Sequence, residues 1–274
     1  MTELISCYRQ AAEAIRAADA LLIGAGAGMG VDSGLPDFRG PEGFWRAYPA
    51  FQGRRFEEIS NPVWFHSDPA QAWGFFGHRL HLYRETIPHA GFATLRRWGE
   101  ERSHGYFVFT SNVDGQFQKS GFSEARIVEC HGSIHHLQCG EPCNSAIWSS
   151  KDVNIRVDAA TVRAQLPWPL CPHCGGIARP NILMFGDYQW LAERTEEQCQ
   201  RYRNWLAELQ GKRLVVIELG AGLAVPSVRY ECERRNATLI RCNPRDFDIP
   251  PRGIAISVGA LEAIQGIDAR LNGG

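Results

Sequence analysis

Five short apolar runs, bounded by polar or turn-forming residues, limit the fold of this 274-residue chain more than any other feature. The first run, Ala20–Ile23, stops at a glycine cluster, which is typical of a buried parallel strand. The other four have the same character: Tyr106–Thr110, Leu214–Leu219, Ala237–Ile240 and Ile254–Val258. Each run predicts one strand of a sheet that is covered on both faces.

Segments with helical periodicity lie between these runs. Apolar residues at three- and four-residue spacing predict helices at Leu4–Ile15, His89–Arg102, Ala192–Leu209, Ser227–Arg235 and Ala260–Leu271. Strands that alternate with helices predict an α/β fold, built as a doubly wound, Rossmann-like parallel sheet.

Two segments interrupt this alternation, and we interpret them as insertions that form a smaller lobe. Residues 41–87 form a helical insertion, in which Asp68 and Pro69 predict the start of a helix. Residues 133–180 are mostly polar and contain four clustered cysteines, as a zinc-binding insertion would. A ligand cleft is expected between the lobes. The rest of the chain would form the discontinuous Rossmann-like domain: residues 1–40, 88–132 and 181–274.

Composition excludes several classes of protein. A net charge of −1 disfavours a protein that binds nucleic acid, and the sequence lacks an apolar run near the ~20 residues that span a bilayer. Nine cysteines in a chain of this length argue against a disulfide framework and for a reducing compartment. We therefore expect a cytoplasmic protein with no membrane or nucleic-acid partner, and the sequence leaves its oligomeric state open.

A glycine-rich loop, Gly24–Gly34, follows the first predicted strand. Glycines let backbone amides approach a phosphate, but the last glycine of the usual dinucleotide fingerprint falls on Met29 or Val31. This spacing disfavours a dehydrogenase, and the absence of a Walker lysine disfavours a P-loop kinase. Binding of some nucleotide and a loop without a ligand both remain open. The loop leads to Asp37-Phe38-Arg39, which we interpret as a lid over a ligand or as a surface loop with an Asp37–Arg39 ion pair.

Two close cysteine pairs, Cys139-x3-Cys143 and Cys171-x2-Cys174, have the spacing of a tetrahedral thiolate zinc site. Four protein ligands leave no position for water, so the spacing predicts a structural zinc ion rather than a catalytic one. Four unrelated reduced thiols are the alternative.

Polar residues follow the second predicted strand. Ser111-Asn112-Val113-Asp114 stands at the carboxyl end of a central strand, which is the usual position of α/β sites. His131 follows a strand-like run, Ala125–Glu129, at the junction with the cysteine-rich segment. Among the nine histidines it is the best candidate for a general base, and a purely structural histidine is the alternative.

These motifs run in one order along nearly the whole chain, and together they resemble the sirtuin family of NAD-dependent protein lysine deacylases. The resemblance implies NAD as co-substrate, one structural zinc ion per chain and an acyl-lysine protein or peptide as partner. The matching segments are Gly26-Ala27-Gly28, Ser33–Arg39, Thr110–Asp114, His131-Gly132-Ser133, the four cysteines, Arg179-Pro180, Phe185-Gly186, Gly220–Leu223 and Asn243.

The resemblance also implies a role for each matching residue. His131 would act as general base on a ribose hydroxyl, Asn112 would orient the ribose or a water molecule, and Asp114 would hold the nicotinamide carboxamide. The products would be nicotinamide, free lysine and O-acyl-ADP-ribose. Residues expected to contact NAD are Gly26, Ala27, Gly28, Asp37, Phe38, Arg39, Ser111, Asn112, Val113, Asp114, Gly220, Ala221, Gly222, Asn243 and Ala260.

Substrate residues follow from the same resemblance. A substrate strand would pair beside Phe185 and Gly186 and lie near Leu223 and Val225. Family members that remove acidic acyl groups carry Tyr-x2-Arg in the acyl pocket, where this chain has Phe76 and Arg79. Arg79 is therefore a candidate to bind a succinyl or malonyl carboxylate, and a solvated helix arginine is the alternative.

The chain departs from the family pattern near the nucleotide and the substrate. Gly30 and Ser111 replace Ser and Gln, Ala221-Gly222 replaces Thr-Ser, Asp187 replaces Glu, and Pro226 comes one residue early. These changes keep two alternatives to a deacylase open. One is an NAD glycohydrolase or ADP-ribosyltransferase, and the other is a non-catalytic module that binds NAD or ADP-ribose.

Overall fold

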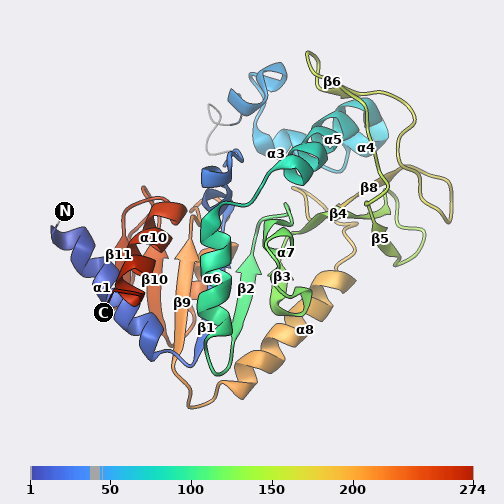
Figure 1. Ribbon diagram of the computed structural model, residues 1–274. Coiled ribbons are helices and arrows are strands. Elements are labelled where there is room, and N and C mark those ends of the chain that lie inside the picture. The colour runs from blue at the N-terminus through green and yellow to red at the C-terminus, as the bar shows by residue number, and fades with distance from the viewer. Residues whose placement is uncertain (1, 38–43, 45, 274) are drawn as a thin grey trace.

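The computed structural model of the chain describes residues 2–37, 44 and 46–273. Its main body is a six-stranded parallel sheet in the order β11-β10-β9-β1-β2-β3 (Figure 1). The predicted α/β sheet is confirmed, although the first strand and the last two have other limits than predicted. The strands are β1 (Ala20–Ala25), β2 (Tyr106–Thr110), β3 (Ile127–Glu129), β9 (Leu214–Leu219), β10 (Thr238–Cys242) and β11 (Ile254–Ile256).

Helices cover both faces of this sheet, as the continuously apolar strands require. Along β1, Leu21 and Ile23 belong to one apolar cluster, whereas Ala20 and Leu22 belong to the cluster on the opposite face. The first cluster includes α1 (Thr2–Ala17), α6 (Ala90–Glu100) and α10 (Ala260–Leu271), and the second includes α8 (Glu193–Glu208) and α9 (Ser227–Glu233).

The order of the strands reverses at β1. From β1 the chain continues to β2 and β3 on one side, and later returns to place β9, β10 and β11 on the other side. The chain that follows β1 leads to α6 on one face of the sheet and the chain that follows β9 leads to α9 on the other face, so a crevice forms at the carboxyl ends of these two strands. This is where an open α/β sheet binds its ligands.

A smaller lobe lies beyond the carboxyl ends of the strands (Figure 1). It has its own apolar core, to which α5 contributes Trp73, Phe75 and Phe76. Asp68 caps α5 as predicted, because its side chain accepts a hydrogen bond from the backbone nitrogen of Gln71. The residue limits of the lobes stay a prediction. The lobe contains η2 (Pro49–Phe51), α3 (Phe56–Ile59), α4 (Trp64–Ser67), α5 (Pro69–Glu85) and strands β4 (Gly132–Cys139), β5 (Ile147–Ser149), β6 (Val157–Asp158), β7 (Arg163–Ala164) and β8 (Ala178–Ile182).

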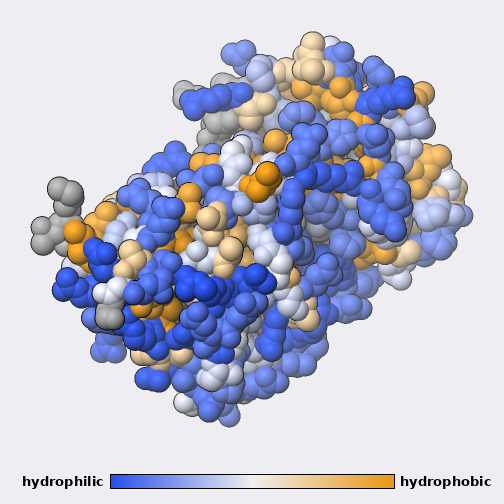
Figure 2. All heavy atoms as spheres, in the orientation of Figure 1, coloured by the Kyte–Doolittle hydropathy of each residue, from blue (hydrophilic) through white to orange (hydrophobic). Residues whose placement is uncertain are grey.

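Three short helices connect the larger elements: η1 (Ala27–Ser33), α7 (Gln116–Lys119) and η3 (Glu124–Arg126). The face of the molecule in Figure 2 is mainly hydrophilic, and apolar groups gather over the smaller lobe. Within the described part of the chain, no helix combines the length and the apolar character that a membrane crossing needs.

Candidate active site

A cavity of about 1170 Å³ opens at the carboxyl ends of β1 and β9 and extends to the smaller lobe. Its volume exceeds the roughly 300–1,000 Å³ of a pocket for one small ligand, so a dinucleotide and a lysine side chain can share it. Predicted site residues that line it are Gly26, Ala27, Asp37, Arg79, Ser111, Asn112, Val113, Asp114, His131, Phe185, Gly186, Gly220, Ala221, Gly222, Leu223 and Val225.

Two glycine loops meet at the crevice, one after β1 and one after β9. The backbone nitrogen of Gly28 donates to the carbonyl of Gly220 at 3.0 Å, and that of Gly26 donates to Leu219 at 3.0 Å. A Cβ atom on Gly28 would lie 2.7 Å from the Cα of Gly220, and Gly220 has a φ of +60°. Both positions therefore need glycine for close packing of the loops. The Gly28 amide bonds to Gly220 in this structure, and the contact of Gly28 with NAD stays a prediction.

The polar segment after β2 is fixed to the first glycine loop. The Asn112 side chain donates from Nδ2 to the carbonyl of Gly26 at 3.0 Å, and the Asn112 backbone nitrogen donates to the Thr110 hydroxyl at 3.0 Å. Thr110 in turn donates to the carbonyl of Ala25 at 2.8 Å. These bonds hold the Asn112 side chain in one orientation at the cavity, just after the carboxyl end of β2.

Asp114 is the buried acid of the cavity. Its side chain accepts from the backbone nitrogen of Gln116 at 2.9 Å, and its carbonyl bonds to Nε2 of His135 at 2.9 Å. Burial raises the pKa of Asp114 to about 6, and the charge of Glu129 adds to the rise. The carboxyl group thus titrates just below neutral pH, which suits a group that binds an uncharged amide.

His131 lies between β3 and β4, half-buried in the cavity wall. Its carbonyl accepts a hydrogen bond from Leu183 at 3.0 Å, which ties it to the end of β8. Burial lowers the pKa of His131 below its usual range, and a bond to the Ser111 backbone opposes this effect. The imidazole is therefore neutral at pH 7 and can accept a proton from a ligand in the cavity.

The loop after β10 brings Arg245 and Asp246 into the cavity, two residues that the sequence did not indicate. Buried Asn243 organises this loop, because its Oδ1 accepts from the backbone nitrogens of Arg245 and Asp246 at 3.0 and 3.1 Å. Its Nδ2 donates to the carbonyl of Ala221 at 2.9 Å. The Asn243 residue is 0% exposed and its side chain bonds to the two loops, and its contact with NAD stays a prediction.

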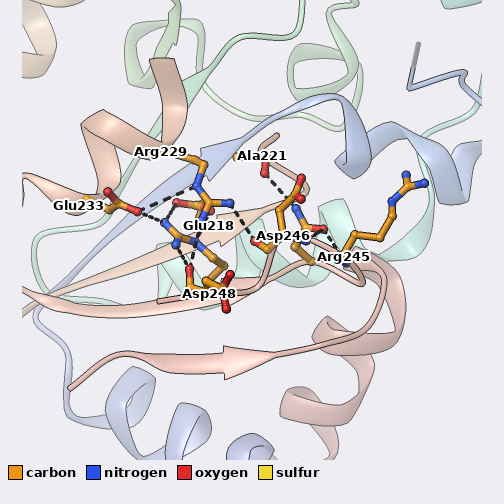
Figure 3. A network of polar contacts seen from close by, with 9 residues as sticks. Glu218, Ala221, Arg229, Glu233, Arg245, Asp246 and Asp248 are labelled. Carbon is orange, nitrogen blue, oxygen red and sulfur yellow. Dashed lines mark hydrogen bonds and ion pairs between the residues drawn. The ribbon is translucent and has the colours of Figure 1, made fainter. Parts of the chain in front are cut away.

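Two buried arginines donate hydrogen bonds to backbone carbonyls of the same loop (Figure 3). Arg229 donates to the carbonyls of Asp246 and Asp248 at 2.8 and 3.1 Å. Arg241 bonds Glu218 on the neighbouring strand through two hydrogen bonds of 2.6 and 2.8 Å, and it also donates to the carbonyl of Asp248. Because the two guanidinium groups bind the carbonyls of Asp246 and Asp248, they hold the backbone of the loop in one conformation at the cavity wall.

Arg79 lies on α5 at the part of the cavity formed by the smaller lobe. It is 6% exposed, and its Nε and Nη2 donate to the Tyr83 hydroxyl at 3.0 and 2.8 Å. Its guanidinium carbon lies 5.2 Å from the ring centre of Phe75. The alternative of a solvated arginine is therefore wrong. Tyr83 was missed by sequence reasoning, although its spacing of four residues from Arg79 was the available signal.

The remaining predicted residues lie elsewhere. Phe76 is 0% exposed and stacks on Phe65 in the core of the smaller lobe, so its predicted contact with the acyl group needs correction. Ala260 is 3% exposed at the start of α10 and does not line the cavity. Phe38 and Arg39 lie outside the described residues. Asp37, which precedes them, pairs with Arg245 at 2.9 Å across the cavity.

The four cysteines of the smaller lobe come together as predicted. Their sulfur atoms all lie within 4.8 Å of one another, with 3.6 Å between Cys139 and Cys174 and 3.7 Å between Cys143 and Cys171. A tetrahedral zinc thiolate site with bonds of about 2.3 Å has sulfur–sulfur edges of about 3.8 Å. The cluster therefore fits a structural zinc ion.

Comparisons with known proteins agree with this site. The model of the Sir2 family matches residues 26–209. The chain belongs to the Sir2 family. Similar relatives of this Sir2 protein include "NAD-dependent protein deacylase 2" from Pyrobaculum aerophilum, 33% identical, with 82% of this chain and 80% of the relative covered. The "NAD-dependent protein deacylase" of Aquifex aeolicus is 28% identical over 82% of this chain and 83% of its own length.

Solved structures share the fold of this Sir2 protein. A crystal structure described as a Sir2 homolog–NAD complex superposes with a TM-score of 0.67 at 21% identity, covering 96% of this chain and 94% of that chain. The main sheet and the smaller lobe thus form the Sir2 fold.

Proposed function

We propose that this protein is an NAD-dependent protein lysine deacylase. One observation carries the proposal: in a Sir2-family chain, His131, Asn112 and Asp114 line one cavity with both glycine loops. The names of the relatives support the same activity. A reducing, cytoplasmic location belongs to the proposal and is supported by the cysteine usage.

The chemistry of such a reaction places specific demands on the cavity. NAD supplies an electrophilic ribose carbon, and the acyl oxygen of the lysine replaces nicotinamide at that carbon. Asp114 would accept hydrogen bonds from the departing carboxamide, because its carboxylate is buried and ionised at neutral pH. His131 would then remove a proton from a ribose hydroxyl, which allows that hydroxyl to attack the acyl carbon.

The cavity wall also explains how a peptide would enter. Phe185 and Gly186 line the cavity together with Leu223 and Val225. Leu223 and Val225 are exposed at 62% and 44%, so an extended peptide would cover apolar groups that otherwise contact water. Backbone pairing between these two segments would direct the lysine inward.

The position of Arg79 supports an acidic acyl group as the preferred substrate. Its guanidinium lines the cavity and is oriented by Tyr83, so a succinyl carboxylate would meet a buried, pre-oriented cation. Tyr83 supplies the hydroxyl that Phe76 lacks. A buried charge–carboxylate contact is large enough to decide between substrates.

A panel of peptides tests the proposal. We expect nicotinamide release from NAD only with acyl-lysine peptides, and faster release with succinyl-lysine than with acetyl-lysine. Replacing Arg79 with Gln should lower kcat/KM for the succinyl peptide about 10- to 100-fold, while the acetyl peptide serves as internal control. Rapid release from NAD alone would support a glycohydrolase instead, and no release with any peptide would contradict the proposal.

The pKa of Asp114 predicts how NAD binding depends on pH. The ionised carboxylate is present above a pH of about 6 and is lost as the pH falls below it. We expect the Kd for NAD, measured by calorimetry from pH 5 to 8, to rise as the pH falls through this range. Asp114→Asn should bind more weakly and lose this dependence. If the variant keeps the same pH profile, another group is responsible.

A further inference from the structure

Ser227 contacts the candidate base directly. Its hydroxyl lies 3.2 Å from Nε2 of His131, and it is the first residue of α9. In the tautomer that carries its proton on Nδ1, Nε2 is the acceptor and the Ser227 hydroxyl donates to its lone pair.

By the resemblance to the family pattern, Pro226 comes one residue early, so Ser227 stands where that pattern would place a proline. A proline has no hydroxyl and could not bond to the imidazole. The shift of one residue therefore gives His131 a side-chain partner.

Ser227 is also held on a rigid element. The next residue, Val228, is 1% exposed, and Arg229 anchors the helix to the carbonyls of Asp246 and Asp248 (Figure 3). The backbone of Ser227 therefore has a fixed position relative to the cavity. A group that orients a catalytic side chain requires such support.

We propose that Ser227 is a positioning residue for His131, a proposal that rests on the deacylase function. In the free protein its hydroxyl donates to the single lone pair of Nε2 and fixes the orientation of the ring. A bound ribose hydroxyl displaces the Ser227 hydroxyl from this lone pair and then gives its proton to Nε2, after which the Ser227 hydroxyl rotates and accepts a hydrogen bond from the new N–H. Ser227 keeps its own proton throughout, and the only transferred proton passes from the ribose to His131.

Two partial reactions separate this role from general damage. Nicotinamide exchange comes before proton removal by His131, whereas O-acyl-ADP-ribose formation needs it. Ser227→Ala should lower the rate of product formation about fivefold, the size of one neutral hydrogen bond, and leave exchange unchanged. Ser227→Thr should restore the rate because it keeps the hydroxyl, and Tyr230→Ala, exposed on the same helix, is the matched control.

An NMR measurement tests the contact without any enzyme assay. The ¹⁵N shift of Nε2 in ligand-free protein should change in Ser227→Ala and stay the same in Tyr230→Ala. An unchanged shift, an unchanged product rate, or equal losses in both partial reactions would overturn the proposal. If the parent protein shows the shift but deacylates no peptide, the proposed function fails while the contact stands.

Discussion

Replacing His131 with alanine is expected to lower O-acyl-ADP-ribose formation by about 10²- to 10⁴-fold, the usual contribution of a general base. Burial lowers the pKa of His131, which favours the neutral imidazole that accepts a proton at pH 7. Alanine leaves the ribose hydroxyl without an acceptor. Mass spectrometry of the acylated product and a separate assay of nicotinamide exchange would measure the two steps.

The controls for this variant follow from the fold. His66 lies on α4 with its side chain 48% exposed, so His66→Ala should keep full activity. The melting temperature of His131→Ala should stay close to that of the parent, since the side chain is only half-buried. Product formation at the parent rate by His131→Ala would remove His131 from the mechanism, and the non-catalytic alternative would then regain support.

The main sheet could be predicted because its signal is local. Strands buried on both faces must be apolar throughout, so β1, β2 and β9 stand out as runs such as Ala20–Ile23. The carboxyl ends of parallel strands meet at one edge, so residues that follow them, such as Asn112, could be assigned to a site. The last two strands, β10 and β11, were less well bounded, because their ends depend on neighbouring segments rather than on composition.

The contacts that orient the site could not be predicted, because each joins residues far apart in the chain. The side chains of Ser227 and His131 are in contact at 3.2 Å, and Arg245 pairs with Asp37. Asn243 is a further example: both ends of its amide bond to backbone groups of two loops, and its contact with NAD stays a prediction. A sequence motif gives the position of such a residue, and only packing decides whether its side chain reaches the ligand.

Loss of the zinc ion is expected to destabilise the protein and to inactivate it as well. Cys171→Ser removes one of the four thiolates, and we expect a loss of at least about 4 kcal/mol, as for other structural metal sites. A loss of that size lowers Tm by about 8–12 °C in a chain of this length. Differential scanning calorimetry and zinc quantification would measure both effects, and Cys7→Ser, a half-buried thiol outside the cluster, is the control.

Activity should fall together with stability, because the metal cluster and the base share two strands. Cys139 ends β4, whose first residue, Gly132, follows His131 directly. β4 and β8 form an antiparallel pair that runs from Gly132 and Ile182 to Cys139 and Ala178. The zinc site lies at one end of this pair and His131 lies at the other. Without zinc the pair loosens, and His131 loses its fixed position. If Cys171→Ser retained one zinc per chain and the parent melting temperature, the four sulfurs would not be a structural metal site.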